Sequence, residues 1–168
     1  MSYIRTSLIA TLLISPFVHA ACFRHVGKRF HISPLLLEAI ARKESHMYNH
    51  AINTKNNNNT EDVCMMGVNS SHYKKLASLG ITRQRLLTDP CVCVAAGAWV
   101  LNGFFEHYGR SWDTVGMYNT GPNPRLKQLR MTYADDIRHI FNQLAREQSV
   151  RPDAFGHYNG PPAPFSEG

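Results

Sequence analysis

The chain of 168 residues contains few charged side chains, since Asp, Glu, Lys and Arg together make up only 18% of it. Soluble domains average about a quarter, so coiled coils and long solvated helices are poor candidates. The net charge of +6 permits an acidic partner, but the chain lacks a Lys/Arg stripe and a nucleic-acid recognition motif. Its hydrophobic content of 43% suffices for a core, and its length predicts one domain.

Long hydrophobic runs are missing after the first 20 residues. Those residues combine a short start with one positive charge, a mostly apolar stretch over 7–18, and small residues at Val18 and Ala20, the two positions that a signal peptidase reads. This pattern is typical of a secretory signal peptide, and the stretch is too short for a comfortable membrane span. We predict a signal peptide over 1–20, cleaved after Ala20 or Ala21, and an exported mature chain. An N-terminal core helix and a lipid anchor at Cys22 are the alternatives.

The chain also lacks a Cys-x2-Cys pair, which disfavours a metal site. The mature chain has four cysteines, and an even number in an exported protein predicts disulfides. Cys91 and Cys93 point in roughly opposite directions on a helix, so they are poor partners for each other. Two pairings remain: Cys22–Cys91 with Cys64–Cys93, or the crossed version.

Most of the mature chain has a helical pattern, without internal repeats. The polar segment 47–61 has no hydrophobic period, which predicts a small β-hairpin or irregular loop region near 52–68. Pro and Gly crowd the sequence after Gln148 and predict a disordered tail over 148–168. The expected fold is therefore mainly α, as a single helical domain over 21–147.

Several local signals set the expected helix boundaries. Ser33-Pro34 and Asp89-Pro90 each combine an N-cap residue with a proline in the first turn. Ser111 is expected to cap a short helix that ends in a turn over 118–122. Further expectations are a capping box at Thr132 and Asp135, and a core position for Tyr108 at the end of an apolar stripe.

Glu44 stands on the apolar face of the helix that Ser33-Pro34 begins. Leu37, Ile40 and Ala41 share this face. Partial burial raises the pKa of a carboxyl group, and a nearby helix C-terminus disfavours its charge. Both effects favour the protonated form that a general acid requires. Periodicity alone, however, favours a glutamate that points into solvent.

Asp62 is a second carboxylate, next to Glu61 in the segment of the expected hairpin. An acid on a helix and a carboxylate on the following hairpin form the layout of glycoside hydrolysis. Acidic residues in turns are commonly solvated, so the spacing alone favours a solvent-exposed Asp62 without a role in catalysis.

Four blocks of sequence occur in order between residues 23 and 147. They are Glu44-Ser45, Met65-Met66-Gly67-Val68-Asn69, the segment Trp112 to Gly121 with Tyr118-Asn119, and Tyr133-Ala134-Asp135-Asp136-Ile137. Together these blocks resemble the bacterial lytic transglycosylases with a lysozyme-like (SLT) domain. The resemblance is greatest to the small members that accompany type III secretion, conjugation and type IV pilus systems.

The resemblance implies an enzyme that cuts the β-1,4 bond from N-acetylmuramic acid to N-acetylglucosamine in peptidoglycan. It implies that Glu44 acts first as acid and then as base, and that the product is a 1,6-anhydro sugar formed without water, metal or cofactor. The expected protein is a periplasmic monomer that opens the wall for an envelope-spanning apparatus. Its expected partners are glycan strands and proteins of that apparatus.

The same resemblance assigns further site residues. Tyr118 is expected to hold Glu44 through its hydroxyl group, and Met66 to line the sugar cleft. Asn69, Asn119 and Ser45 are the other expected substrate-binding residues. A turn at Asn119 and a helix end at Ser45 are the simpler alternatives.

The cysteine near the mature N-terminus and the Asp-Pro-Cys start of the central helix also match the small subgroup. This favours Cys22–Cys91, which leaves Cys64–Cys93. Cys64 itself stands where the family has a glycine, and Gly67 stands where it has a glutamine that could contact an N-acetyl group.

We hypothesise that Asp62 faces the cleft and stabilises the positive centre on the muramic acid. Two alternatives follow. One is a hydrolytic muramidase of the same fold, in which water attacks and Asp62 has a larger role. The other is a module that binds a glycan or an apparatus protein without cutting, which the missing glutamine at Gly67 favours.

Overall fold

The computed structural model describes residues 16–56, 59–149 and 154–155, with the backbone alone at 16–19. This part of the chain forms helices α1 (Pro16–Phe30), α2 (Pro34–Ser45), α3 (Tyr73–Ala77), α4 (Arg83–Thr88), α5 (Pro90–Tyr108), α6 (Trp112–Thr120) and α7 (Lys127–Glu147). Two short 3-10 helices, η1 (Ser70–His72) and η2 (Pro124–Leu126), precede α3 and α7. The strands β1 (Ile52–Asn53), β2 (Asp62–Val63) and β3 (Val68–Asn69) form an antiparallel sheet in that order. The predicted fold class is confirmed.

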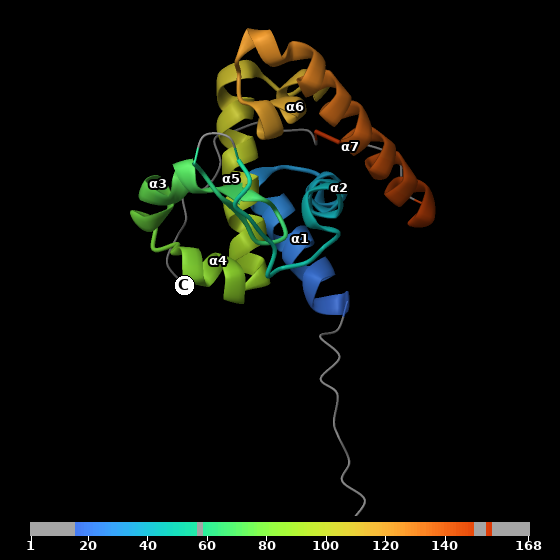
Figure 1. Ribbon diagram of the computed structural model, residues 1–168. Helices are drawn as coiled ribbons and strands as arrows, with labels where there is room; N and C mark the ends of the chain where they lie inside the picture. Colours follow the sequence, from blue (N-terminus) through green and yellow to red (C-terminus); the bar gives the residue numbers. More distant parts are fainter. Residues whose placement is uncertain (1–15, 57–58, 150–153, 156–168) are drawn as a thin grey trace, which may run out of the picture.

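Helix α5 forms the centre of the domain and contacts α1, α2, α4 and α6, while α7 lies along α2 and α6 (Figure 1). The predicted stripe of α5 is buried as far as Phe105. Tyr108 was predicted to be a core residue, but its side chain is 51% exposed. It is the last residue of α5 and its ring packs against Phe104 at the surface, with 6.5 Å between ring centroids. The apolar spacing along α5 thus extends one turn further than the buried part of the helix, which ends at Phe105.

Side-chain caps begin two of the helices as predicted. The Asp89 carboxylate accepts hydrogen bonds from the backbone N–H groups of Cys91 and Val92, and the Ser111 hydroxyl accepts one from Thr114. Ser33 differs, because its side chain makes no capping hydrogen bond. The start of α2 depends instead on Pro34 and on the backbone carbonyl of Ser33, which accepts from the N–H groups one turn later.

The structure corrects two predicted boundaries near the C-terminus. Helix α6 continues through Thr120, so the segment predicted as a turn is helical until Gly121, whose φ of 65° ends it. Helix α7 begins at Lys127, so Thr132 lies inside it. The Thr132 hydroxyl donates to the Gln128 carbonyl at 3.1 Å rather than capping a helix. Contacts between α6 and α7 outweigh the local turn and cap signals. The short helix α4 was not predicted.

The disulfides connect the first turn of α5 to two other parts of the domain. Cys22 of α1 pairs with Cys91, and Cys64, directly after β2, pairs with Cys93. This is the pairing that the family resemblance implied.

The ends of the described chain pack onto the domain. Helix α1 begins at Pro16, inside the segment predicted as a signal peptide, and residues 1–15 lie outside the described part. Of the predicted tail, Ala154 is buried and the Phe155 ring packs edge-on against Trp112, with 5.4 Å between centroids. The rest of the tail beyond Ser149 lies outside the described residues. In the ranges that the structure covers, no helix combines the length and apolar character of a membrane span.

Helices α6 and α7 lie close together at Gly116, where a Cβ atom would lie 2.4 Å from the backbone oxygen of Arg130. A Gly116→Ala substitution forces the helices apart and should lower the free energy of unfolding by about 1–3 kcal/mol. Gly103 of α5 has open space around its Cα, so Gly103→Ala should raise that free energy by about 0.5–1 kcal/mol. Urea denaturation of both variants measures the difference. Equal effects would contradict the close approach at Gly116.

Candidate active site

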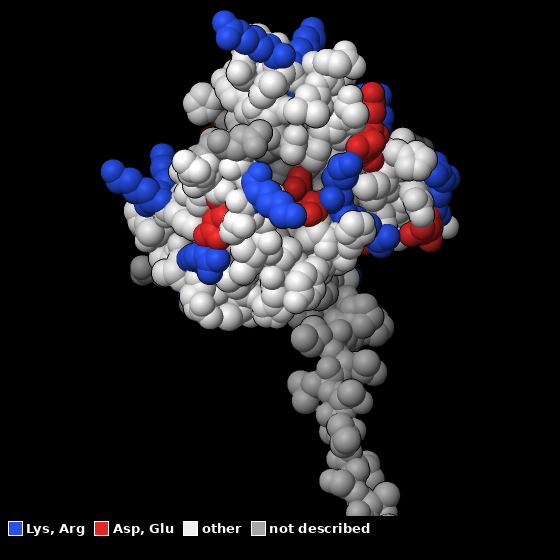
Figure 2. Space-filling view, viewed as in Figure 1, with Lys and Arg blue, Asp and Glu red and all other residues white. Residues whose placement is uncertain are grey.

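An open cleft of about 760 Å³ contains the two predicted carboxylates, Glu44 and Asp62. Its walls come from the sheet region, from α5 and α6, and from the η2–α7 segment. On the face in Figure 2, acidic side chains lie in the middle and Lys and Arg side chains lie beside them. The lining includes Lys55, Asn56, Thr60, Gly67, Asn69, His72, Val100, Phe104, Met117, Tyr118, Asn119, Leu126 and Leu129.

Glu44 lies in the last turn of α2, and the C-cap residue His46 that follows has a left-handed conformation with a φ of 54°. One oxygen, Oε1, accepts a hydrogen bond of 2.5 Å from the Tyr133 hydroxyl of α7. The other, Oε2, lies against Gly67, where a Cβ atom would come within 2.7 Å of it. The backbone there has a φ of 60°, a conformation that favours glycine. Glycine at position 67 therefore makes room for the carboxyl group.

The pKa of Glu44 is raised from 4.5 to about 7, mainly because the carboxyl group is buried. The hydrogen bond from Tyr133 lowers this pKa and the negative charge of Asp62 raises it, while Lys43 lowers it. The raised pKa agrees with a Glu44 side chain on the apolar face of its helix, and not with the solvent-facing side chain that periodicity alone favoured. A large fraction of Glu44 is thus protonated near neutral pH, as a general acid requires.

Asp62 lies on β2, opposite Asn69 of β3. Its Oδ1 accepts a hydrogen bond of 2.7 Å from Asn69 Nδ2, and its Oδ2 accepts one of 2.9 Å from Asn56 Nδ2. Asn53 Nδ2 donates a third, longer bond of 3.4 Å to Oδ2, so three side-chain amides hold the carboxylate at the cleft. The structure places Asp62 in the same cleft as Glu44, as we hypothesised.

Tyr118 was expected to hold Glu44, but its hydroxyl donates to the backbone carbonyl of Met66 at 2.8 Å. Tyr133 makes the hydrogen bond to Glu44 instead. The sequence marked Tyr133 only as the start of the last family block. Its contact joins residues 89 apart in the chain, which no local signal reports.

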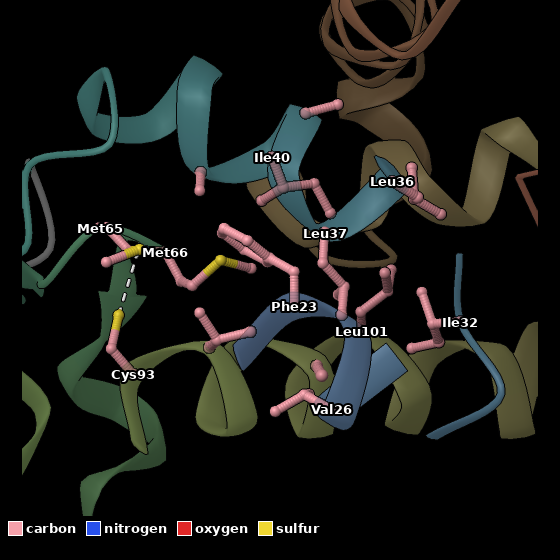
Figure 3. Close-up of a cluster of buried hydrophobic side chains, with 14 of the residues drawn as sticks. Phe23, Val26, Ile32, Leu36, Leu37, Ile40, Met65, Met66, Cys93 and Leu101 are labelled. Carbon is pink, nitrogen blue, oxygen red and sulfur yellow. Dashed lines mark hydrogen bonds between the residues drawn. The ribbon is translucent and has the colours of Figure 1, made fainter. Parts of the chain in front are cut away.

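Met66 was expected to line the sugar cleft, and this prediction is wrong. Its side chain is fully buried and packs against Gly97 of α5. Figure 3 shows it within the cluster of buried hydrophobic side chains. The Met66 side chain is buried because its thioether has no strongly polar group that needs water, and because it fills the space that Gly97 leaves on α5. The residues that the turn after β2 contributes to the cleft are Gly67 and Val68.

Ser45 has a structural hydrogen-bonding role. Its hydroxyl donates to the Met65 carbonyl at 3.0 Å and accepts from the backbone N–H of Tyr48 at 3.0 Å. Asn69 and Asn119 both line the cleft. The Asn69 side chain is occupied by Asp62, Thr60 and a backbone N–H of η1, whereas Asn119 is exposed.

The described residues contain no cluster of three His, Cys, Asp or Glu side chains that would suit a metal ion. The cleft itself presents two carboxyl groups, one with a raised pKa and one held by side-chain amides. This is the pattern of glycoside cleavage.

Residues 21–141 match the family model of the transglycosylase SLT domain. The chain belongs to this family. It is a peptidoglycan lytic transglycosylase, and the expectation from the four sequence blocks is confirmed.

The chain is also similar in sequence to individual proteins. Protein IpgF of Shigella flexneri is 40% identical over 128 residues, which cover 76% of this chain and 84% of IpgF. Invasion protein IagB of Salmonella typhimurium is 39% identical over 125 residues, or 74% of this chain and 78% of IagB. The X polypeptide of Escherichia coli K12 is 36% identical over 146 residues, or 85% and 86% of the two chains.

A crystal structure of an inactive mutant of lytic transglycosylase Slt from Pseudomonas aeruginosa shares the fold, with a TM-score of 0.66. The sequences are 16% identical, and the match covers 85% of this chain. It covers only 27% of the Slt chain, so the present chain corresponds to about a quarter of that protein.

The raised pKa of Glu44 makes stability depend on pH. Between about pH 4.5 and 7 the unfolded chain releases the proton while the folded chain keeps it, so stability falls as the pH rises. Glu44→Gln cannot ionise and still accepts the hydrogen bond from Tyr133. It should exceed the wild type in unfolding free energy by roughly 2–3 kcal/mol at pH 8 and by much less at pH 4. Urea denaturation at the two pH values measures this.

Glu61→Gln provides a control of opposite sign. The hydrogen bond from Arg83 lowers the pKa of Glu61, so the ionised carboxylate stabilises the fold above its ordinary pKa, and this contribution is lost as the pH falls. The variant should be less stable than the wild type at pH 8. A Glu44→Gln difference that is the same at both pH values would contradict the burial of Glu44.

Proposed function

We propose that this lytic transglycosylase cuts the β-1,4 bond between N-acetylmuramic acid and N-acetylglucosamine, with Glu44 as both acid and base. The observation that carries the proposal is the position of Glu44. Its carboxyl group is buried enough to have a pKa of about 7, yet it lines the open cleft. A pKa near the working pH suits a group that must first give and then take a proton.

The proposed reaction begins with protonated Glu44 at the glycosidic oxygen. Glu44 donates its proton to this oxygen as the bond to C1 breaks, and N-acetylglucosamine leaves as an alcohol. The muramic acid then carries an oxocarbenium-like centre. The Glu44 carboxylate removes the proton of the C6 hydroxyl, whose oxygen bonds to C1. The product is a 1,6-anhydro sugar, Glu44 is protonated again, and no water is consumed.

Asp62 supports the cationic stage of this reaction. Its carboxylate lies in the same cleft and is oriented by three amide donors, so its charge is available to the developing positive centre. The same placement favours a second candidate function, a muramidase of the lysozyme type. In that reaction water attacks C1 and the product is a reducing sugar.

Substrate contacts and cellular setting complete the proposal. We assign sugar binding to the exposed Asn119, and assign Asn69 a contact to substrate beside its role with Asp62. We further propose that residues 1–20 direct export to the periplasm, where a monomer opens the wall for a secretion, conjugation or pilus apparatus. The sequence blocks of the small subgroup and the similarity to a Salmonella invasion protein support this setting.

Digestion of purified sacculi tests the reaction. The mature protein should release fragments with anhydro-muramic ends, and Glu44→Gln should release fewer by at least about 10³-fold because it removes both acid and base steps. Mass spectrometry distinguishes anhydro ends from reducing ends, which are heavier by one water. Reducing ends labelled from ¹⁸O-water would establish the muramidase instead. Absence of any release from a folded wild-type protein would contradict both enzymes and favour the binding module.

Asp62→Asn tests the second carboxylate. Loss of the charge should lower kcat about 10²-fold and should move the alkaline limb of the pH profile to lower pH, because Asp62 raises the pKa of Glu44. Glu61→Gln is the matched control, since Glu61 is the neighbouring carboxylate but pairs with Arg83. Turnover by Asp62→Asn equal to that of the control would remove Asp62 from the mechanism.

A further inference from the structure

The floor beneath the Glu44 carboxyl group is a short turn between β2 and β3, Cys64–Gly67, which we call the active-site turn. Two of its residues have a positive φ, 63° at Cys64 and 60° at Gly67. The backbone N–H of Gly67 donates to the Cys64 carbonyl at 3.0 Å and closes the turn. Because a Cβ atom at Gly67 would approach Glu44 Oε2 to 2.7 Å, a small displacement of this turn changes the surroundings of the carboxyl group.

The active-site turn is attached to several helices. The Ser45 hydroxyl of α2 donates to the Met65 carbonyl at 3.0 Å, and the Tyr118 hydroxyl of α6 donates to the Met66 carbonyl at 2.8 Å. Cys93 of α5 makes two attachments. It forms the disulfide with Cys64, and its Sγ accepts a hydrogen bond of 3.3 Å from the Met66 N–H, drawn as a dashed line in Figure 3.

The conformation of Cys64 is unusual for its residue type. Left-handed backbone is uncommon for residues with a side chain and natural for glycine, and glycine is what the family resemblance implies at this position. Here the chain has a cysteine, whose bridge ties the turn to the central helix. Both sulfur-bearing residues are fully buried. The bridge thus lies at a residue with a left-handed backbone, three residues from the contact with Glu44.

We propose that the Cys64–Cys93 disulfide is a positioning element of the active site, which holds the active-site turn against Glu44 and makes turnover depend on an oxidising compartment. The inference rests on the proposed role of Glu44 as the acid. When the bridge is absent, the turn moves away from the carboxyl group, water reaches Glu44, and the proton is held less firmly at neutral pH. The domain itself remains folded around the other disulfide.

The chain supplies a matched control in the Cys22–Cys91 disulfide. Both bridges end in the first turn of α5, but Cys91 and Cys93 point to roughly opposite sides of that helix. Cys22–Cys91 joins α1 to α5 and closes a separation of 69 residues, against 29 for Cys64–Cys93. Its loss should therefore lower stability at least as much. Comparison of variants that lack one or the other disulfide therefore distinguishes a general loss of stability from a displacement of the active-site turn.

The experiment compares Cys64→Ser/Cys93→Ser with Cys22→Ser/Cys91→Ser and the wild type on soluble, uncrosslinked glycan strands. We expect both variants to be folded by circular dichroism with a lowered melting temperature. Cys64→Ser/Cys93→Ser should lose at least tenfold in kcat with little change in KM. Its alkaline limb should shift by about one unit to lower pH, as desolvation of Glu44 is relieved. The control variant should keep kcat within about twofold and keep the pH profile.

A second variant, Cys64→Gly/Cys93→Ala, separates the tether from the backbone conformation, because glycine adopts the positive φ freely. It should also lose kcat and shift the profile. Wild-type turnover by this variant or by the serine variant would overturn the proposal, as would equal losses in the two serine pairs. Failure of both Cys64/Cys93 variants to fold would overturn it too, since the bridge would then stabilise the whole domain. An inactive wild type would instead contradict the proposed function.

Discussion

The contact between the Glu44 carboxyl group and the backbone of Gly67 connects a helix end to a turn 23 positions later in the chain. It excludes water from one side of the carboxyl group, and Tyr133 covers the other side with a hydroxyl donor. The raised pKa of Glu44 follows mainly from this burial. The acid function of the cleft therefore depends on how closely α2, α7 and the turn after β2 pack together.

The helical core makes this packing possible. Met66 is buried against Gly97 of α5, so the turn after β2 is seated directly on the central helix. The part of the cleft at Glu44 and Gly67 is thus supported by a dense apolar layer, in which side chains have little freedom to shift. Because its neighbours are fixed, the Glu44 carboxyl group stays buried to the same extent, and its pKa stays raised.

Sequence patterns predicted the helices whose signals are local. Asp89-Pro90 and Ser111 cap helices as expected, because an N-cap bond involves residues two or three apart. Patterns failed where distant contacts override local composition, as over residues 118–120, where helix α6 continues along α7 in place of the expected turn. They failed also at Tyr108, since periodicity does not report where the covering elements stop.

The sequence by itself determined the family and the mainly helical fold, because recognisable blocks and helical spacing are written along the chain. It also placed the Glu44 carboxyl group on the apolar face of its helix, because that position depends on spacing within one element. Only the tertiary structure decided which residues surround that carboxyl group. Tyr133 and Gly67 reach it, whereas Tyr118 bonds to Met66, and Met66 itself is buried. The hydrogen bonds among them join residues 52 and 89 positions apart, and their partners are selected by packing rather than by any pattern along the chain.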